Sequence, residues 1–276
     1  MSFTFNDLYI LGTIGRDAMK SKEIVTTILT PIFSIASTYA LSIYANLGPV
    51  IGASLICLIG GLFFGGYAGV NNSGAFAGMT SRIVMPSIEY TLLAGLLVGV
   101  LWVVFIKSFL GYGGKQGAIG FISVNISSLI LYFINPISFL NLNAYSVINA
   151  TYVFLIIFSS AVGTVSTIFL REKVVQKTFK QNDSIIGAAI IGLLAGFLIP
   201  AFPIPYSSTL PAVIAAGSYA GMSSRKILEK DIDFVIVGII TGIMFIILLP
   251  LSIGCGGKLG TSAFISVIVW KLFKRR

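Results

Sequence analysis

Two short segments with the pattern Gly-Gly-Lys-x-Gly carry the residues best suited to bind a small ligand. They cover residues 113–117 and 256–260, and each lies between two long apolar runs. Glycine lets backbone N–H groups approach a ligand, and the N-terminus of a following helix carries partial positive charge. A lysine beside such a turn adds a cationic donor for an anion. The candidate substrate-binding residues are therefore Gly113, Gly114 and Lys115, with Gly256, Gly257 and Lys258.

A structural interpretation of the same segments stays open. Tight turns need glycine, and a lysine near the end of an apolar run can extend its ammonium group to lipid phosphates. The spacing also differs from that of a Walker A phosphate loop. Anion binding and headgroup contact are both compatible with Lys115 and Lys258.

A second pair of segments, residues 74–82 and 217–225, is rich in small residues and ends in Ser-Arg. Each carries Gly-x-x-x-Gly, a spacing that allows close helix packing. Hydroxyl groups stand beside an arginine, and short interrupted helices bind solute in inverted-repeat transporters. Packing alone would also explain the glycines. The candidates for solute contact are Ser81, Arg82, Ser224 and Arg225, with Asn71 and Asn72 in the first copy only.

These motifs belong to an internal duplication. A single gapless register relates residues 74–124 to residues 217–267, so that Lys115 corresponds to Lys258, and 17 of those 51 positions are identical. Upstream, residues 51–53 match residues 186–188 in a shifted register. A recurrence of this length predicts two homologous structural repeats.

The amino-acid composition indicates that the repeats fold in a lipid bilayer. Hydrophobic residues make up 56% of the chain, charged residues 10%, and the mean hydropathy is +0.99. Soluble domains carry about 25% charged residues, so this chain needs a lipid bilayer. Its apolar runs are long and do not alternate, which favours helices over a barrel. The sequence predicts an all-α, multi-pass protein of the cell membrane, with Asn71-Asn72-Ser73 ending the second apolar run and capping the helix that follows.

The orientation of the repeats depends on the number of crossings in each. Four spans per repeat would give parallel copies, and five would give inverted copies. The loop at residues 171–183 carries four cations, which the positive-inside rule places in the cytoplasm. This favours five helices per repeat in inverted topology, the third short and Gly-rich, with both termini cytoplasmic. The predicted organisation is an amphipathic segment (1–23), repeat 1 (24–134), an uncharged linker (135–149) and repeat 2 (150–276).

Several functional classes lose support from the sequence. The chain contains no histidine, its nine carboxylates lie at run boundaries, and its two cysteines show no CxxC spacing. We therefore expect no catalytic residues, no metal site and no cofactor. The net charge of +9 fits cytoplasmic loops and lipid headgroups better than nucleic acid.

Two functions remain from the sequence. The favoured one is a transporter or channel for a small solute, with an anion as the favoured class and the pathway at the repeat interface. The alternative is a non-transporting scaffold or a subunit of a larger membrane complex. The expected partners are membrane lipids and the small solute, and a homo-oligomer is compatible with the sequence.

Overall fold

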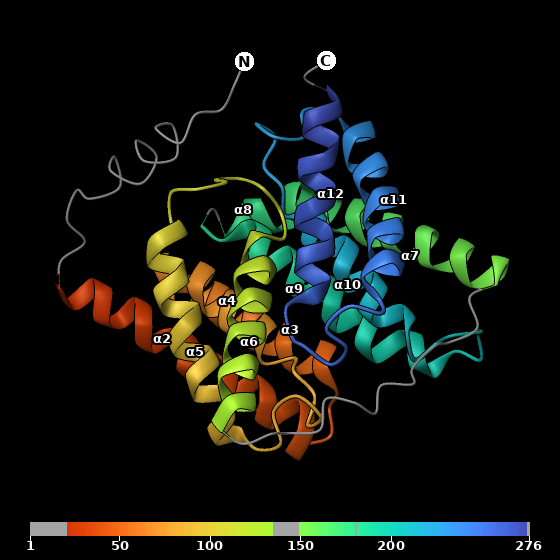
Figure 1. Cartoon of the computed structure of the whole chain (residues 1–276). Coiled ribbons are helices and arrows are strands. Elements are labelled where there is room, and N and C mark those ends of the chain that lie inside the picture. Colours follow the sequence, from red (N-terminus) through yellow and green to blue (C-terminus); the bar gives the residue numbers. More distant parts are fainter. Residues whose placement is uncertain (1–20, 135–148, 180, 275–276) are drawn as a thin grey trace.

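The computed structural model describes residues 21–134, 149–179 and 181–274, all helices and connecting turns within these ranges (Figure 1). The expected amphipathic segment and the uncharged linker lie almost entirely outside the described residues. The first half contains α2 (Ser21–Tyr39) with η1 (Ala40–Tyr44), α3 (Pro49–Phe63), η2 (Gly65–Tyr67), α4 (Ala68–Ala77), α5 (Ile88–Phe105) and α6 (Lys115–Ile134). The second half contains α7 (Ala150–Leu170) with η3 (Arg171–Val175), α8 (Gln176–Thr178), α9 (Asp183–Leu198), η4 (Ile199–Ala201), α10 (Leu210–Gly221), α11 (Asp231–Leu248) and α12 (Lys258–Lys274).

Within the described residues, six helical stretches are long and apolar enough to cross a bilayer. They comprise α2 with η1, α5, α6, α7 with η3 and α8, α9 with η4, and α11. Large apolar side chains such as Phe63 and Phe133 are more than three-quarters exposed, as expected for surfaces in contact with lipid. The described residues are all-helical as predicted, and their six long apolar stretches agree with the predicted multi-pass membrane protein.

Glycines bring helices of each half into backbone contact at matching positions. A Cβ atom added to Gly95 of α5 would lie 2.7 Å from the Ile32 Cα atom of α2. A Cβ atom added to Gly238 of α11 would lie 2.7 Å from the Ala161 Cα atom of α7. The same close approach therefore occurs once in each half, between corresponding helices.

Helices α3 and α9 join the two halves through a reciprocal contact. Gly61 of α3 packs against Ile186 of α9, and Gly196 of α9 packs against Ile51 of α3. The upstream register found in the sequence pairs the two glycines with each other and the two isoleucines with each other. Each half thus offers a glycine to an isoleucine of the other half.

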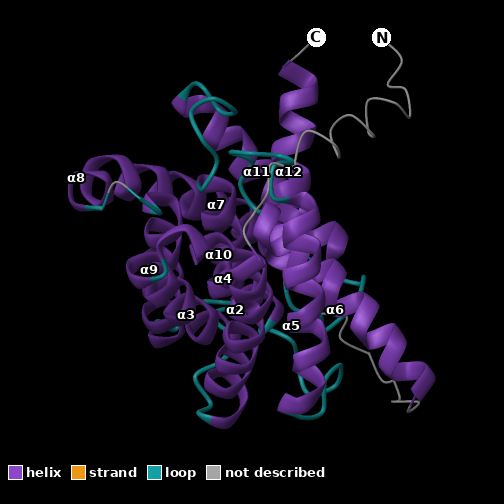
Figure 2. Cartoon of the chain, turned by 90° about the vertical axis from the view of Figure 1, so that its left-hand side faces the viewer, coloured by secondary structure: helices purple, strands orange, loops and turns teal. Residues whose placement is uncertain are grey.

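The short helices α4 and α10 lie in the middle of the bundle (Figure 2). They contain 10 and 12 residues, which corresponds to about 15–18 Å of helix and is shorter than a hydrocarbon core of about 30 Å. Every residue of α4 except Gly69 is buried. Pro211 lies in the first turn of α10, where proline is tolerated.

The prediction that Asn71-Asn72-Ser73 ends the second apolar run is wrong. The chain breaks earlier, at residues 64–67, where Gly65 has φ +51°. Asn71 lies inside α4, where its Nδ2 donates to the Ile56 carbonyl oxygen at 3.0 Å and its Oδ1 accepts from Ser34 Oγ at 2.7 Å. Contacts with α3 and α2 therefore satisfy an amide that would otherwise favour a helix end.

Candidate functional site

The two Gly-Gly-Lys turns each bind the end of the short helix in the other half. Gly113 N donates to Ser223 Oγ at 3.0 Å, and Gly256 N donates to Thr80 Oγ1 at 3.0 Å. The register of the duplication relates the two donors to each other and the two acceptors to each other. The N–H groups that the sequence offered for an anion are therefore used in contacts between the halves.

The Ser-Arg segments add a second pair of hydrogen bonds at the same place. Ser81 N donates to the Gly254 carbonyl oxygen, and Ser224 N donates to the Gly111 carbonyl oxygen, both at 2.8 Å. The sequence placed these serines near solute. The structure places them where one half joins the other.

The helices that follow the turns cross at glycine. A Cβ atom added to Gly117 of α6 or to Gly260 of α12 would collide with the backbone of the other residue. Gly114 and Gly257 have φ values of +79° and +82° and pack against the opposite helix. From this crossing α6 and α12 run in opposite directions (Figures 1 and 2). The N-termini of both helices thus converge at one point.

Lys115 and Lys258 occupy equivalent positions and bind the ends of the preceding helices. Lys115 Nζ donates to the Ile106 carbonyl oxygen at 3.1 Å. Lys258 Nζ donates to the carbonyl oxygens of Leu249 and Leu251 at 3.2 and 3.0 Å. Cations at helix C-termini are stabilised by the helix dipole and satisfy free carbonyl groups. Each lysine therefore has a structural role in addition to any role in binding.

Lys115 also lines a pocket of about 200 Å³ that both halves form. The side chain is only 7% exposed, and its Nζ lies 5.3 Å from the centroid of the Trp102 ring. The pocket therefore places a buried ammonium group against an aromatic wall. The first half also contributes the polar residues Tyr112 and Gln116 to the lining. The second half contributes Ser184 and Met222.

The polar groups of this pocket are suited to a small anion. An ammonium group has three N–H donors, and the Lys115 ammonium has one carbonyl acceptor, at Ile106. The buried Oε1 of Gln116 has no hydrogen-bond partner among the described residues. Lys115 can therefore bind a carboxylate or another small anion, and Gln116 Oε1 can accept a hydrogen bond only from a separate hydroxyl or N–H group of the same solute. Trp102 and Tyr112 would limit the size of the bound group.

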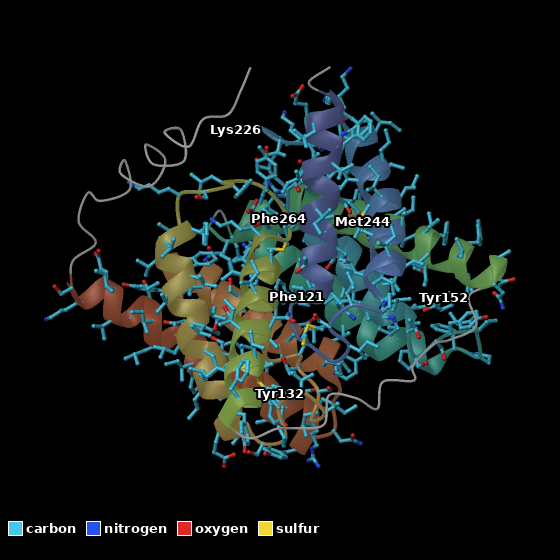
Figure 3. All side chains as sticks on the ribbon, viewed as in Figure 1. Phe121, Tyr132, Tyr152, Lys226, Met244 and Phe264 are labelled. Atoms are coloured by element: carbon cyan, nitrogen blue, oxygen red, sulfur yellow. The ribbon has the colours of Figure 1, made fainter. Side chains whose placement is uncertain are left out.

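Aromatic packing from α12 supports the rim of the pocket. Phe264 lies on α12 (Figure 3). Its ring centroid is 5.1 Å from that of Phe109 and 6.4 Å from that of Tyr112. Phe109 and Tyr112 both line the pocket. The loop before α6 is thus held in place by a helix of the other half.

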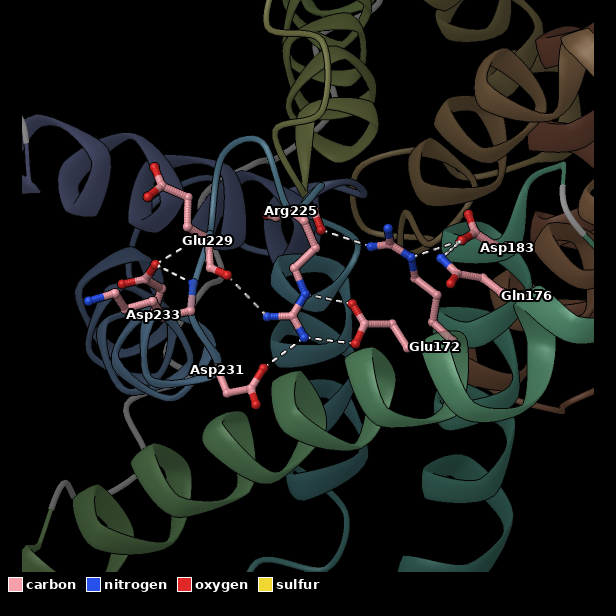
Figure 4. A network of polar contacts seen from close by, with 10 residues as sticks. Glu172, Gln176, Asp183, Arg225, Glu229, Asp231 and Asp233 are labelled. Atoms are coloured by element: carbon pink, nitrogen blue, oxygen red, sulfur yellow. Dashed lines mark hydrogen bonds and ion pairs between the residues drawn. The ribbon is translucent and has the colours of Figure 1, made fainter.

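Arg171 joins the two segments that supply the second half's side of the pocket, and Figure 4 shows the polar contacts at Asp183. Arg171 Nε lies 3.0 Å from Asp183 Oδ2, and its Nη1 donates to the Ser223 carbonyl oxygen at 2.8 Å. Asp183 precedes Ser184 in the chain, and Ser223 follows Met222. The two second-half residues of the pocket are therefore adjacent to the two partners of one arginine, which is 8% exposed.

Arg225 belongs to an ion-pair network beside this arginine. It forms two hydrogen bonds with Glu172, at 2.6 and 2.7 Å, and an ion pair with Asp231 at 2.7 Å (Figure 4). The bonds to Glu172 raise the pKa of Arg225 above its ordinary value. Its counterpart Arg82 is exposed and lies 5.5 Å over the Tyr44 ring. Neither arginine lines the Lys115 pocket.

Asn72 differs from the other candidates. Its side chain is buried within α4, and neither Nδ2 nor Oδ1 has a hydrogen-bond partner among the described residues. The structure therefore separates the candidates into three groups. Lys115 lies in a pocket, the Asn72 side chain and the Ser81 hydroxyl are buried without partners, and the remaining candidates make contacts within the protein.

Sequence reasoning missed Trp102, Gln116, Ser184, Met222 and Arg171. The signal available for two of them was a difference between the copies. In the register of the duplication, Gln116 is matched by a leucine and Trp102 by a phenylalanine. These two pocket residues therefore differ between the copies, whereas Lys115 is the same in both.

No family model, no curated protein and no solved structure matches this chain with significance.

Proposed function

We propose that the protein is a transporter or channel for a small anionic solute, and that the pocket around Lys115 lies on its pathway. The observation that carries this proposal is a polar pocket, with a buried lysine, formed by both halves. A buried cation in a membrane protein is costly and marks sites of function. The role is binding and passage of the solute, without a chemical reaction.

The alternative function is a scaffold or a subunit of a larger membrane complex. The tight contacts at Gly114 and Gly257 favour it, because they show a large part of the interface closely packed. A scaffold has no need for a buried ammonium group beside a pocket. The Lys115 pocket therefore supports transport over the alternative.

Uptake by proteoliposomes tests the function. The purified protein would be reconstituted, and uptake of radiolabelled chloride, acetate and lactate would be measured against protein-free liposomes. We expect at least one of these anions to enter faster with the protein present. Uptake equal to that of protein-free liposomes for all three would contradict the assignment to small anions and favour the scaffold.

We also propose that the halves are inverted repeats with both termini in the cytoplasm. The opposite directions of the corresponding helices α6 and α12 support inversion (Figures 1 and 2), and the reciprocal contacts between the halves support a two-fold relation. The basic residues of the loop at 171–183 support the orientation.

Tags on two loops test the inverted arrangement. One tag would be inserted within residues 135–149 and the other after Phe179, in the loop between Arg171 and its partner Asp183. We expect the first to be accessible only from outside intact cells and the second only after permeabilisation. Access to both from the same side would rule out inverted repeats, because a single span, α7, separates the two loops.

A further inference from the structure

The wall of the Lys115 pocket contains a hydrogen-bond acceptor that the protein leaves without a partner. This acceptor is Oε1 of Gln116, a residue that lines the pocket, and it is buried with no donor among the described residues. A buried polar atom without a partner lowers the stability of the fold. A hydrogen bond donated by a bound solute would remove this penalty.

The second half shows that the fold does not need an amide at this position. In the register of the duplication Gln116 corresponds to Leu259, and each is the second residue of its helix. Leu259 packs against two clusters of buried apolar residues. Leucine thus fills the equivalent place without leaving a polar atom unpaired. A glutamine in the first half is explained by a ligand that donates to it.

Lys115 determines the charge of that ligand. Its buried ammonium group has three N–H donors and one carbonyl acceptor, at Ile106. Helix α6 begins at this residue, and its N-terminus adds partial positive charge. Among the described residues that line the pocket, none is acidic. An anionic group therefore binds at Lys115, and a second positive charge on the solute would have no counterion there.

The dimensions of the pocket limit the solute to a short molecule. Lys115 and Gln116 are consecutive in the chain and line the same pocket of about 200 Å³, so the anion and the donor must be close together in the solute. A cavity of about 150 Å³ binds benzene, which has the same number of heavy atoms as lactate. The pocket thus has room for a molecule of this size.

We propose that the Lys115 pocket binds a short α-hydroxycarboxylate, with the carboxylate at the Lys115 ammonium group and the hydroxyl donating to Gln116 Oε1. The assignment rests on the transport function proposed above and names the class of solute. A hydroxyl group is favoured over a methyl group because a methyl group leaves Oε1 without a partner. It is favoured over an ammonium group because Lys115 repels a second positive charge.

Three probes of equal size test this selectivity. Lactate, isobutyrate and alanine have the same number of heavy atoms and differ in the group beside the carboxylate, which is a hydroxyl, a methyl or an ammonium group. Their binding to the purified protein in detergent would be measured by isothermal titration calorimetry at neutral pH. We expect lactate to bind about tenfold more tightly than isobutyrate, and alanine to bind more weakly than lactate. Lactate binding no more tightly than either of the other two would overturn the proposal.

Gln116→Leu tests the residue that selects the hydroxyl group. The variant reproduces the second half at this position, so we expect it to fold. Lactate should bind about tenfold more weakly to it, whereas isobutyrate should bind as before, and the two affinities should become equal. The matched control is Leu259→Met at the equivalent position, which should keep the preference for lactate. A Gln116→Leu protein with the wild-type preference would overturn the assignment of the hydroxyl group to Gln116.

The uptake assay separates this selectivity from the general function. Uptake of chloride or acetate by a protein that binds lactate and isobutyrate equally would reject the α-hydroxycarboxylate and leave the transport function in place. Preferential binding of lactate by a protein that takes up none of the anions would support the selectivity of the pocket and reject transport.

Discussion

Gly257→Ala is expected to prevent the chain from accumulating as folded protein. Gly257 has φ +82°, a conformation that costs a residue with a side chain about 1–2 kcal/mol. The added Cβ atom would also meet Phe121 N and the Gly117 carbonyl oxygen more closely than the 3.0 Å that real Cβ atoms keep. Both are backbone atoms of α6, so the clash can be relieved only by separating α6 from α12. Together these effects exceed about 4 kcal/mol, a large part of the stability of most proteins.

Two other glycines provide matched controls. Gly66→Ala adds a Cβ atom with no heavy atom within 4 Å and without a positive φ, so it should leave the thermal unfolding midpoint in detergent nearly unchanged. Gly48→Ala adds a Cβ atom in equally open space at φ +79°. Its loss of stability therefore measures the cost of the positive φ alone, without a steric clash. A Gly257→Ala protein with the same unfolding midpoint as Gly66→Ala would show that the crossing of α6 and α12 is not as close as described.

Arg171→Met is expected to lower stability strongly and to reduce anion uptake. Removing one partner of a buried ion pair costs about 3–5 kcal/mol, and we expect the lower end of this range because Asp183 is 18% exposed and keeps hydrogen bonds from Gln176 Nε2 and Ser184 N. Here Asp183 would lose its guanidinium partner, and the Ser223 carbonyl oxygen would lose a donor. The pocket should lose its shape at the same time, since Ser184 and Met222 adjoin these two partners. Thermal unfolding and proteoliposome uptake measure the two effects.

Arg82→Met is the control for this substitution. Arg82 is exposed, and its contact with the Tyr44 ring is worth about 0.5–1 kcal/mol at such a site. The double variant Arg171→Met/Asp183→Leu should recover part of the lost stability, because no charge is then left unpaired. An Arg171→Met protein as stable as Arg82→Met would argue against a structural role for the ion pair.

The helical fold and the duplicated motifs followed from the sequence, but the partners of those motifs did not. Apolar runs predicted the spans, and the constant register between the copies identified equivalent turns. The hydrogen bonds from Gly113 to Ser223 and from Gly256 to Thr80 join residues 110 and 176 positions apart. No local pattern records such pairings. The sequence therefore predicts solute contact for the hydroxyl groups beside Arg82 and Arg225, whereas those of Thr80 and Ser223 bind the turns of the opposite half.

The preference of asparagine and serine for helix ends also led to a wrong position for the break between α3 and α4. Asparagine and serine favour helix ends, and so Asn71-Asn72-Ser73 was expected to begin a helix. Tertiary contacts to Ile56 and Ser34 hold Asn71 inside α4 instead. Lys115 was predicted from its motif, whereas Trp102 and Ser184 come from other helices and carry no motif. Their positions depend on how the two halves pack, which the pattern of a single segment does not determine.

The comparison of Lys115→Met with Lys258→Met in anion uptake tests the proposed pathway most directly. Both lysines bind the end of the preceding helix, a contact worth about 0.3–1 kcal/mol, so the two substitutions should lower the unfolding midpoint similarly. Lys115 lines the pocket formed by both halves, whereas Lys258 places two donors on carbonyl oxygens. We predict that Lys115→Met loses most of the uptake per folded molecule and that Lys258→Met retains most of it. Wild-type uptake by Lys115→Met, or an equal loss in both variants, would contradict a pathway through this pocket.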